Sequence, residues 1–261
     1  MNASETVLLT GASSGIGLEL AKCFAEDGCR LVLVARNVAA LENLAGELRR
    51  NCKAEVSVMA ADLSLPETPR RIFEELRAAK IVVDVLVNNA GFGLQGAFAE
   101  LSLQSQLEML QVNVTALTEL TGLFLPGMIE RRRGGILNVG SVAGFVPGPN
   151  MAVYYATKAF VQSFTEALAE ELAGSGLTVS VLCPGPTATN FSRVARGDKQ
   201  RRIQTTKMSA EAVARHGHQA YRHGKVVAVP GFGNNFLIFM TRLWPRQAIR
   251  KSVKSFNKIK G

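Results

Sequence analysis

The chain has 261 residues, of which 47% are hydrophobic and 20% are charged, and its formal net charge is +9. This composition is ordinary for a globular protein and excludes a disordered one. The charge is uneven, because residues 193–261 hold 16 Lys and Arg against Asp198 and Glu211. This part of the chain favours an anionic partner (a membrane surface, a nucleic acid or an acidic substrate), or its basic residues only form a solvated face.

The cysteines and the N-terminus indicate a cytoplasmic protein. The four cysteines show neither a metal-ligand spacing nor a paired pattern, so we expect free thiols in a reducing compartment. The N-terminus lacks a basic segment followed by a long apolar region, and no signal peptide is predicted. No apolar run approaches the roughly 20 residues that a bilayer-spanning helix needs.

A glycine-rich turn follows the first expected strand, Thr6–Thr10, and a helix that ends near Gly28 follows the turn. The glycines are spaced G-x-x-x-G-x-G. A glycine turn between a strand and a helix lets the backbone approach a pyrophosphate and directs helix N–H groups at it. This context makes the turn a candidate dinucleotide site. Its residues are Gly11, Ser13, Ser14, Gly15, Ile16 and Gly17.

The second strand, Arg30–Ala35, ends where a dinucleotide-binding fold contacts the adenosine ribose. A site that prefers NAD places an acid there, which bonds the 2′-hydroxyl and repels a 2′-phosphate. Here Arg36 follows, a guanidinium with no carboxylate nearby, which suits the phosphate of NADP. The alternative is that Arg36 only opens the helix expected over 37–51, on its solvent side.

Asp62 and Leu63 follow a third strand, which we expect over 55–60. Asp62 can accept a hydrogen bond from an adenine amino group, or it can cap the following helix. Both residues are therefore candidates for cofactor contact.

A continuous apolar run over 81–87 is typical of a central parallel strand. It leads to Asn88, Asn89, Ala90 and Gly91. The two amides and the glycine at a strand end can connect neighbouring loops, or they can contact a cofactor ribose. Both readings stay open.

A long helix is expected over 103–129, with Asn113 one residue off its apolar stripe. Asn has a poor helix propensity, so we expect it to have a specific partner. Along the whole chain, strands alternate with helices six times, which predicts an α/β fold with a doubly wound parallel sheet. There is no internal repeat or low-complexity linker, so residues 1–261 are predicted to form a single domain.

The segment 141–158 holds a hydroxyl, a phenol and an amine. Tyr154 and Lys158 are four residues apart on a helix expected over 151–174, so they project from one face. An ammonium there favours the phenolate and lowers a tyrosine pKa from about 10 towards neutrality. Ser141 follows an apolar strand, at the sheet edge where ligands bind. The alternative is a surface pair on the helix.

In order and spacing, these motifs resemble the short-chain dehydrogenase/reductase family. The resemblance covers residues 4–190 and rests on the glycine turn, the Asn-Asn-Ala-Gly segment 88–91, Asn113, Ser141, Tyr154-x-x-x-Lys158, Pro184 and Gly185. It implies a Rossmann-like fold with about seven parallel strands, a nicotinamide cofactor, and a homo-oligomer, either a dimer or a tetramer.

The resemblance also implies roles. Tyr154 would be the general acid/base, Ser141 would polarise the substrate carbonyl, Lys158 would bind the nicotinamide ribose and lower the Tyr154 pKa, and Asn113 would hold a water of a proton relay. The loop after the sixth strand would contact the nicotinamide, with Thr189 on its carboxamide. The residues implied in that loop are Pro184, Gly185, Thr187 and Thr189.

Residues 191–225 are basic and occupy the place of the family's substrate lid, for which 191–206 is the candidate. His216, His218 and His223 follow on an expected helix, but their spacing does not favour a metal site. Beyond a last strand over 225–230, the extension 232–261 joins an apolar block to a basic stretch. It packs on the body as helices, or on a partner subunit, or contacts a membrane peripherally. Without interleaved aromatic residues, no nucleic-acid partner is expected.

The favoured function is an NADP(H)-dependent reductase of a lipophilic ketone or aldehyde. The alternatives are a 3-oxoacyl-thioester reductase, an NAD-dependent alcohol dehydrogenase, and a membrane-docking protein with a vestigial cofactor site. The expected partner is a small-molecule carbonyl or alcohol substrate.

Overall fold

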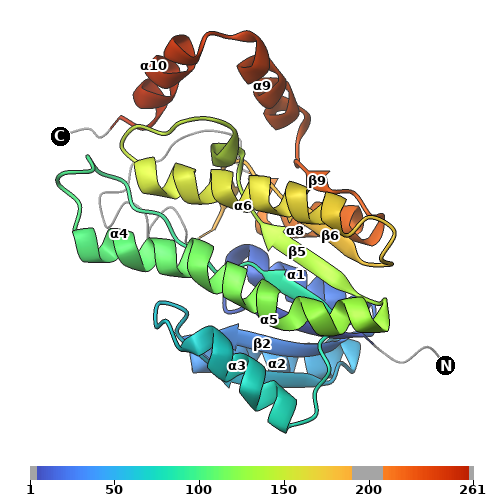
Figure 1. Cartoon of the computed structure of the whole chain (residues 1–261). Coiled ribbons are helices and arrows are strands. Elements are labelled where there is room, and N and C mark those ends of the chain that lie inside the picture. The colour runs from blue at the N-terminus through green and yellow to red at the C-terminus, as the bar shows by residue number, and fades with distance from the viewer. Residues whose placement is uncertain (1–4, 190–207, 259–261) are drawn as a thin grey trace.

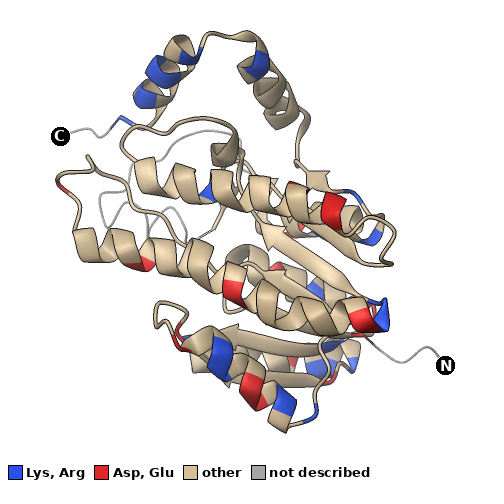
Figure 2. Ribbon diagram, in the orientation of Figure 1, with Lys and Arg blue, Asp and Glu red and all other residues tan. Residues whose placement is uncertain are grey.

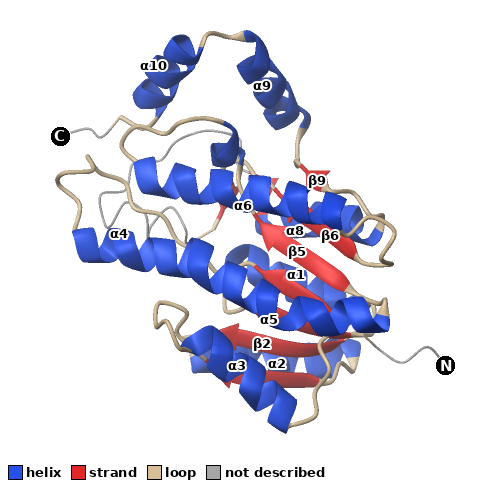
Figure 3. Cartoon of the chain, viewed as in Figure 1, coloured by secondary structure: helices blue, strands red, loops and turns tan. Residues whose placement is uncertain are grey.

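The structure, a computed structural model, describes residues 5–189 and 208–258. Its centre is a sheet of seven strands in the order β3-β2-β1-β4-β5-β6-β9, and all neighbouring strands are parallel. Figure 3 shows helices on both faces of this sheet. The predicted doubly wound α/β fold with a helical C-terminal extension is confirmed.

The strands are β1 (Thr6–Thr10), β2 (Arg30–Ala35), β3 (Val56–Ala60), β4 (Val85–Asn88), β5 (Gly135–Val139), β6 (Thr178–Leu182) and β9 (Val227–Ala228), and the short pair β7 (Thr187–Ala188) and β8 (Met208–Ser209) forms a second sheet. The α-helices are α1 (Gly15–Glu26), α2 (Val38–Cys52), α3 (Thr68–Ala78), α4 (Leu103–Leu110), α5 (Ala116–Arg131), α6 (Ala152–Glu171), α8 (Ala210–Arg222), α9 (Phe232–Leu243) and α10 (Arg246–Phe256). Two further turns are η1 (Gln111–Thr115), which is π-helical, and η2 (Val142–Phe145), which is 3-10 helical.

Two hydrophobic layers cover the sheet. Along β1, Val7 and Leu9 pack against α1, α2 and α8, whereas Leu8 packs against α3 and α5 on the opposite face. Because both faces are covered, the central strands are apolar at nearly every position rather than at alternate ones. This layering holds the carboxyl ends of the strands at one edge, as Figure 1 shows.

The strand predicted over 81–87 begins only at Val85. The preceding residues form a connection in which Val82 is half exposed. At its end Asp84 accepts a hydrogen bond from the backbone N–H of Thr6 with Oδ2 (3.0 Å) and from that of Gly135 with its carbonyl oxygen (2.9 Å). Its side chain thus bonds β1, and the ladder starts one residue later.

The helix predicted over 103–129 is one helical segment, Leu103–Arg131, interrupted by the π turn η1. An 18-residue window within these 29 residues has a mean hydropathy of 1.3, so the segment passes for a membrane span by length and composition alone, contrary to the expectation that no segment does so. However, Leu120, Phe124 and Met128 are buried in the core layer over the sheet. A core helix passes the same test as a membrane span.

The last two helices, α9 and α10, form an arch that stands out from the α/β body in Figure 1. α10 is fixed to the body through buried Ile249 and through Asn257, which directly follows it. No residue of α9 is buried. The extension thus packs as helices: α10 has buried anchor residues, whereas α9 contacts the body only through partly buried or exposed residues such as Asn234, Asn235 and Ile238. The lid predicted over 191–206 lies outside the described residues.

Candidate active site

The glycine turn between β1 and α1 is held in place by the residues that follow β4. The side-chain amide of Asn89 donates to the carbonyl oxygens of Thr10 (2.9 Å) and Gly11 (3.0 Å), and the Thr10 hydroxyl accepts from the backbone N–H groups of Asn89 and Ala90 (both 3.1 Å). Asn89 and Ala90 therefore connect two loops, which is the structural role foreseen for them. Thr10 was not among the predicted site residues, although it directly precedes the glycine turn.

The glycines leave no room for side chains. A Cβ atom on Gly17 would lie 2.3 Å from the Gly11 carbonyl oxygen, and Gly11 itself has a φ of +68°. A Cβ on Gly15 would meet the Thr189 side chain at 3.1 Å. The turn therefore faces the loop after β6, and these two predicted cofactor segments come together at the edge of the sheet.

The other predicted residues of the turn contribute differently. Ser14 directly precedes α1 but makes no side-chain cap, so the first N–H groups of the helix receive no bond from it. Ile16 packs towards the core, as does Leu63 after β3. Only the backbone of these two residues can reach a cofactor.

Arg36 and Asp62 lie side by side beyond the ends of β2 and β3. The guanidinium Nη1 is 3.8 Å from Asp62 Oδ2, and the Arg36 side chain is 76% exposed. The expectation that no carboxylate lies near Arg36 was therefore wrong, because the parallel pairing of the two strands brings Asp62 beside it. Asp62 Oδ1 accepts from Ser64, so it caps a turn and not α3. These bonds and Arg36 outweigh partial burial and hold the Asp62 pKa below its usual range.

Ser141 and Tyr154 meet at the end of β5. Ser141 precedes η2, and its hydroxyl accepts from the Ala143 backbone N–H (3.1 Å). Tyr154 is in the first turn of α6, and its phenol shares a hydrogen bond with the Ser141 hydroxyl. Both side chains are buried. The Ser141 and Tyr154 hydroxyls thus lie together at the end of β5, next to a cluster of apolar side chains.

Lys158 lies one turn further along α6. Its ammonium donates to the Val139 carbonyl oxygen (2.7 Å) and is 6.0 Å from the centroid of the Tyr154 ring. Burial lowers the pKa of Lys158 to about 8 and raises that of Tyr154 to about 12, with Ser141 opposing the latter shift. Burial of the phenol therefore dominates the Tyr154 pKa in this structure, where the Lys158 ammonium is bonded to a backbone carbonyl; that Lys158 lowers this pKa stays a prediction.

Asn113 has the specific partners that its position predicted. It lies in η1, and its side-chain amide bonds both the N–H (3.1 Å) and the carbonyl (2.9 Å) of Phe92 and donates to the Thr157 hydroxyl (3.1 Å). A Cβ on Gly91 would meet both Asn113 Oδ1 (3.0 Å) and Lys158 Nζ (3.6 Å). Asn113, Gly91 and Lys158 thus come together, and the π turn accounts for the offset of Asn113 from the apolar stripe.

The loop after β6 contacts both the site and the arch. The Pro184 carbonyl accepts from Ser141 Oγ at 3.5 Å, and the Thr187 hydroxyl donates to the Gly185 carbonyl (2.9 Å). A Cβ on Gly185 would lie 2.5 Å from the side chain of Asn234 in α9. The predicted cofactor loop is therefore packed against the first turn of the arch.

Asn257 lies beside the site, although nothing in the sequence indicated this. Asn257 is buried beside Tyr155, and its side-chain amide donates to Tyr155 Oη (3.2 Å) and to the Pro149 carbonyl (3.1 Å). Its own carbonyl accepts from Gln95 and Asn150. Tyr155 packs edge-on against Tyr154, with ring centroids 6.0 Å apart. A residue 102 positions away in the sequence thus supports the wall beside Tyr154.

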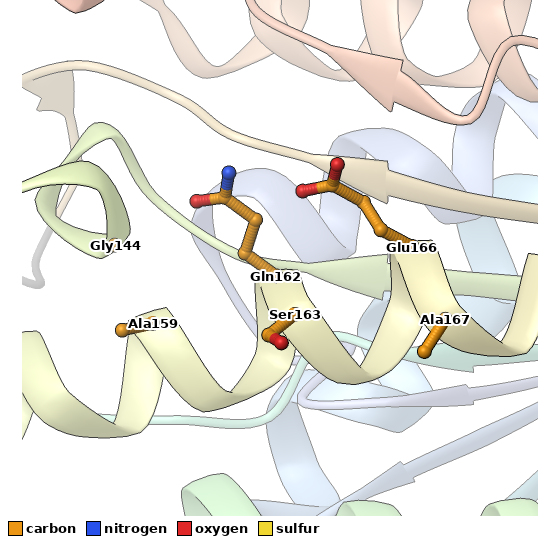
Figure 4. Close-up of a pocket in the computed structure, with 6 residues that line it drawn as sticks. All are labelled: Gly144, Ala159, Gln162, Ser163, Glu166 and Ala167. Atoms are coloured by element: carbon orange, nitrogen blue, oxygen red, sulfur yellow. The ribbon is translucent and has the colours of Figure 1, made fainter. Parts of the chain in front are cut away.

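Two other places in the described structure lie apart from this site. A surface hollow of about 530 Å³ borders α6 and η2, where Gln162 and Glu166 project from the helix (Figure 4), but it includes none of the predicted catalytic residues. The histidines are dispersed: His218 bonds Asp27 (2.9 Å) and His223 bonds a carbonyl of its own helix. Among the described residues, no cluster of three metal-ligating side chains occurs.

Comparison with known proteins agrees with this geometry. The family model described as short chain dehydrogenase matches residues 5–200. The chain is 38% identical over 218 residues to sulfoacetaldehyde reductase 2 of Chromohalobacter salexigens, covering 81% of this chain and 86% of that protein. It is 31% identical over 259 residues to the very-long-chain 3-oxoacyl-CoA reductase of Rattus norvegicus, covering 97% and 80%.

Solved structures show the same fold. A short-chain dehydrogenase from Sphingobium yanoikuyae in complex with NADPH has a TM-score of 0.82 and 32% identity, over 92% of this chain and 94% of that one. A short-chain dehydrogenase/reductase from Burkholderia phymatum in complex with NAD has a TM-score of 0.81 and 27% identity, over 92% and 93%. Similar chains therefore bind either nicotinamide cofactor.

Proposed function

The chain belongs to the short-chain dehydrogenase family, and from this premise we propose that it is an NADP(H)-dependent reductase that converts a lipophilic ketone or aldehyde to an alcohol. The observation that carries the proposal is the hydrogen-bonded pair of Ser141 and Tyr154, buried beside Lys158 at the end of β5. This pair places a proton donor, the Tyr154 phenol, beside a second hydroxyl, that of Ser141. A carbonyl oxygen can be bound between them.

The protonation states suit reduction. With a pKa of about 12, Tyr154 keeps its proton at neutral pH and can donate it to a carbonyl oxygen. Ser141 holds that oxygen through a second hydrogen bond and stabilises its developing charge. Lys158, with a pKa of about 8, is mainly an ammonium at neutral pH and supports the same negative charge. The nicotinamide, when bound, supplies the hydride.

The chain offers a cradle that fits a dinucleotide. The glycine turn has no space for a Cβ at Gly17, and its backbone lies directly before the first turn of α1. Such a turn accepts a pyrophosphate. The exposed Arg36 at the end of β2 favours the 2′-phosphate of NADP, and Asp62 beside it is available to orient the guanidinium or to bond the adenine. Lys158 would bind the nicotinamide ribose, and Asn113 would hold a water of the proton relay that leads to it.

The lipophilic substrate class follows from the wall around Tyr154. The apolar side chains that cluster with Tyr154 come from three separate parts of the chain: Phe92, Leu94, Ala143, Val146, Met151, Val153 and Val253. A charged small substrate would lose hydration there without compensation. A 3-oxoacyl thioester is the second candidate, favoured by the match of 97% of this chain to a very-long-chain 3-oxoacyl-CoA reductase.

Turnover assays with a matched pair of variants test the proposal. With NADPH and a series of aryl and long-chain ketones, aldehydes and 3-oxoacyl thioesters, Tyr154→Phe should lower kcat about 10²- to 10⁴-fold, the range for a lost general acid. Tyr155→Phe removes the neighbouring hydroxyl, which bonds Asn257 instead, and should stay within a few-fold of wild type. Full activity of Tyr154→Phe would refute the assigned role, and equal rates with NADH would refute the cofactor preference.

We also infer that the enzyme works in the cytoplasm as a homo-oligomer, a dimer or a tetramer. The support is the family's common assembly and the exposed apolar surface of α6, where Phe160 stacks on Phe164 with ring centroids 5.7 Å apart. Light scattering after size-exclusion chromatography would measure the mass, and a monomer at micromolar concentration would contradict the inference.

A further inference from the structure

The outer face of α9 is apolar and exposed. Four side chains spaced four, three and four residues apart lie along one stripe of the helix. They are Phe232, Phe236, Phe239 and Leu243, exposed by 87%, 54%, 56% and 64%. Trp244, directly after the helix, is also half exposed. No residue of this helix is buried.

The side of α9 that faces the body is the less apolar one. Ile238 packs against the small cluster around Val229, Asn234 donates to the Pro230 carbonyl, and Thr241 bonds the Ile238 carbonyl within the helix. A helix on a globular body normally turns its apolar stripe inwards. Here the aromatic stripe points outwards, and contiguous exposed apolar surface of this kind marks an interaction site.

The arch is also uniformly basic. Residues 232–258 contain six Lys and Arg, all exposed, and no Asp or Glu: Arg242, Arg246, Arg250, Lys251, Lys254 and Lys258. In Figure 2 the ribbon is blue, for Lys and Arg, on α10 and near the end of α9. On α10, Arg250 and Lys254 are one turn apart, while Ile249 is turned towards the body.

We propose that the α9–α10 arch docks onto the surface of an anionic lipid bilayer. The aromatic stripe of α9 enters the boundary between headgroups and acyl chains, and the basic side chains of α9 and α10 pair with acidic headgroups. A second copy of the chain fits this face poorly, because a symmetric contact would set six positive charges against six. Nucleic acid would satisfy the charge but would leave the phenylalanine stripe in water.

Docking would place the active site at the membrane. α9 begins against the cofactor loop at Gly185, and α10 ends at Asn257 beside Tyr155. Both ends of the arch, the start of α9 and the end of α10, therefore lie next to the site. A bilayer that binds the arch would lie close to the side chains around Tyr154. This inference does not depend on the identity of the substrate or the cofactor.

Vesicle co-sedimentation of the full chain tests the proposal. Vesicles of phosphatidylcholine with about 30 mol% phosphatidylserine should retain the protein at about 0.1 M NaCl, and those of phosphatidylcholine alone should not. Phe236→Ser combined with Phe239→Ser should lower the partition coefficient about tenfold or more. Arg250→Glu combined with Lys254→Glu should lower it about a hundredfold. Cofactor binding, measured in parallel, should not change in either variant and thereby reports that the body is folded.

Matched controls lie outside the arch, on α4 and α3. Leu103→Ser removes an apolar side chain that is equally exposed, and Arg70→Glu with Arg77→Glu reverses two exposed charges of α3. Both should bind vesicles like wild type. The proposal is overturned if wild type ignores anionic vesicles, if controls and arch variants lose binding equally, or if the Phe variants convert a dimer to a monomer without affecting sedimentation. It is also overturned if the charge-reversed arch variant loses binding to a short DNA duplex while its vesicle binding stays intact.

Discussion

Asn257→Ala should release α10 from the body without unfolding the sheet. The substitution deletes two hydrogen bonds, to the Pro149 carbonyl and to Tyr155 Oη, and leaves the partly buried Pro149 carbonyl and the buried Tyr155 hydroxyl without that partner. At about 1 kcal/mol net for each bond, the loss is about 2 kcal/mol, which is roughly a thirtyfold change in the equilibrium between docked and released α10. The two bonds to the backbone carbonyl of residue 257 remain, and so does the contact of Ile249.

Hydrogen exchange followed by mass spectrometry measures this release. Peptides that cover α10 should exchange roughly 30 times faster in Asn257→Ala, whereas peptides from β1 and β5 should not change. Because Val253 of α10 packs in the cluster that surrounds Tyr154, kcat/KM for a lipophilic carbonyl should fall as well. The free energy of global unfolding should change little.

Asn235→Ala is the matched control. Asn235 also makes two side-chain hydrogen bonds, in its case to the backbone carbonyls of Val229 (2.9 Å) and Gly231 (3.0 Å) at the start of α9. It should accelerate exchange in α9 and leave α10 unchanged. If Asn257→Ala left α10 exchange at the wild-type rate, or if the sheet and α10 opened together, the reasoning about a separately anchored helix would be refuted.

Three further predictions concern the site itself. The rate of carbonyl reduction should be constant below pH 8 and fall above it, because Lys158 loses its proton at a pKa of about 8 while Tyr154, with a pKa of about 12, keeps its own. The rate of alcohol oxidation should instead rise with pH as the phenol ionises. Arg36→Ala should weaken NADPH binding about tenfold and leave NADH binding unchanged, as measured by calorimetry. Gly17→Ala should abolish binding of either cofactor and lower Tm by several degrees, because the new Cβ would lie 2.3 Å from the Gly11 carbonyl.

Each of these has a contradicting result. A pH profile for reduction that stays flat well above a pH of about 8 would show that the charge of Lys158 is not needed. Loss of NADPH and NADH affinity together in Arg36→Ala would show that the guanidinium acts on the part common to both cofactors. Normal cofactor binding by Gly17→Ala would show that the turn can widen, with Gly122→Ala as the control in open space.

The elements that could be predicted from the sequence are those that depend on local pattern. Thr6–Thr10 and Arg30–Ala35 are short apolar runs bounded by polar residues and glycines, and the strands have these bounds in the structure. The helix that carries Tyr154 begins within one residue of its predicted start. The likeness of the whole motif set to one family was equally visible, because order and spacing are properties of the sequence itself.

The contacts that could not be predicted depend on which segments, distant in the sequence, meet in the fold. Nothing near Arg36 in the sequence indicates that Asp62 lies 3.8 Å away, because their proximity results from the pairing of β2 with β3. The four-residue spacing of Tyr154 and Lys158 placed them on one face, but it could not show that the ammonium bonds the Val139 carbonyl of β5. Asn257 looked like any polar residue in a basic tail until the fold brought it to Tyr155.

The C-terminal end of the arch returns to Tyr155. It thereby separates cofactor binding from substrate binding, two properties that are usually lost together. The parallel sheet and the glycine turn are complete before residue 231, whereas Val253 and Asn257 line the wall beside Tyr154. Proteolytic removal of α10 would therefore leave a protein whose glycine turn is intact but which has lost one side of the wall beside Tyr154. In a preparation that contains both intact and cleaved chains, titration with cofactor would count both and overestimate the concentration of active enzyme. Titration with a carbonyl ligand would count only the intact chains.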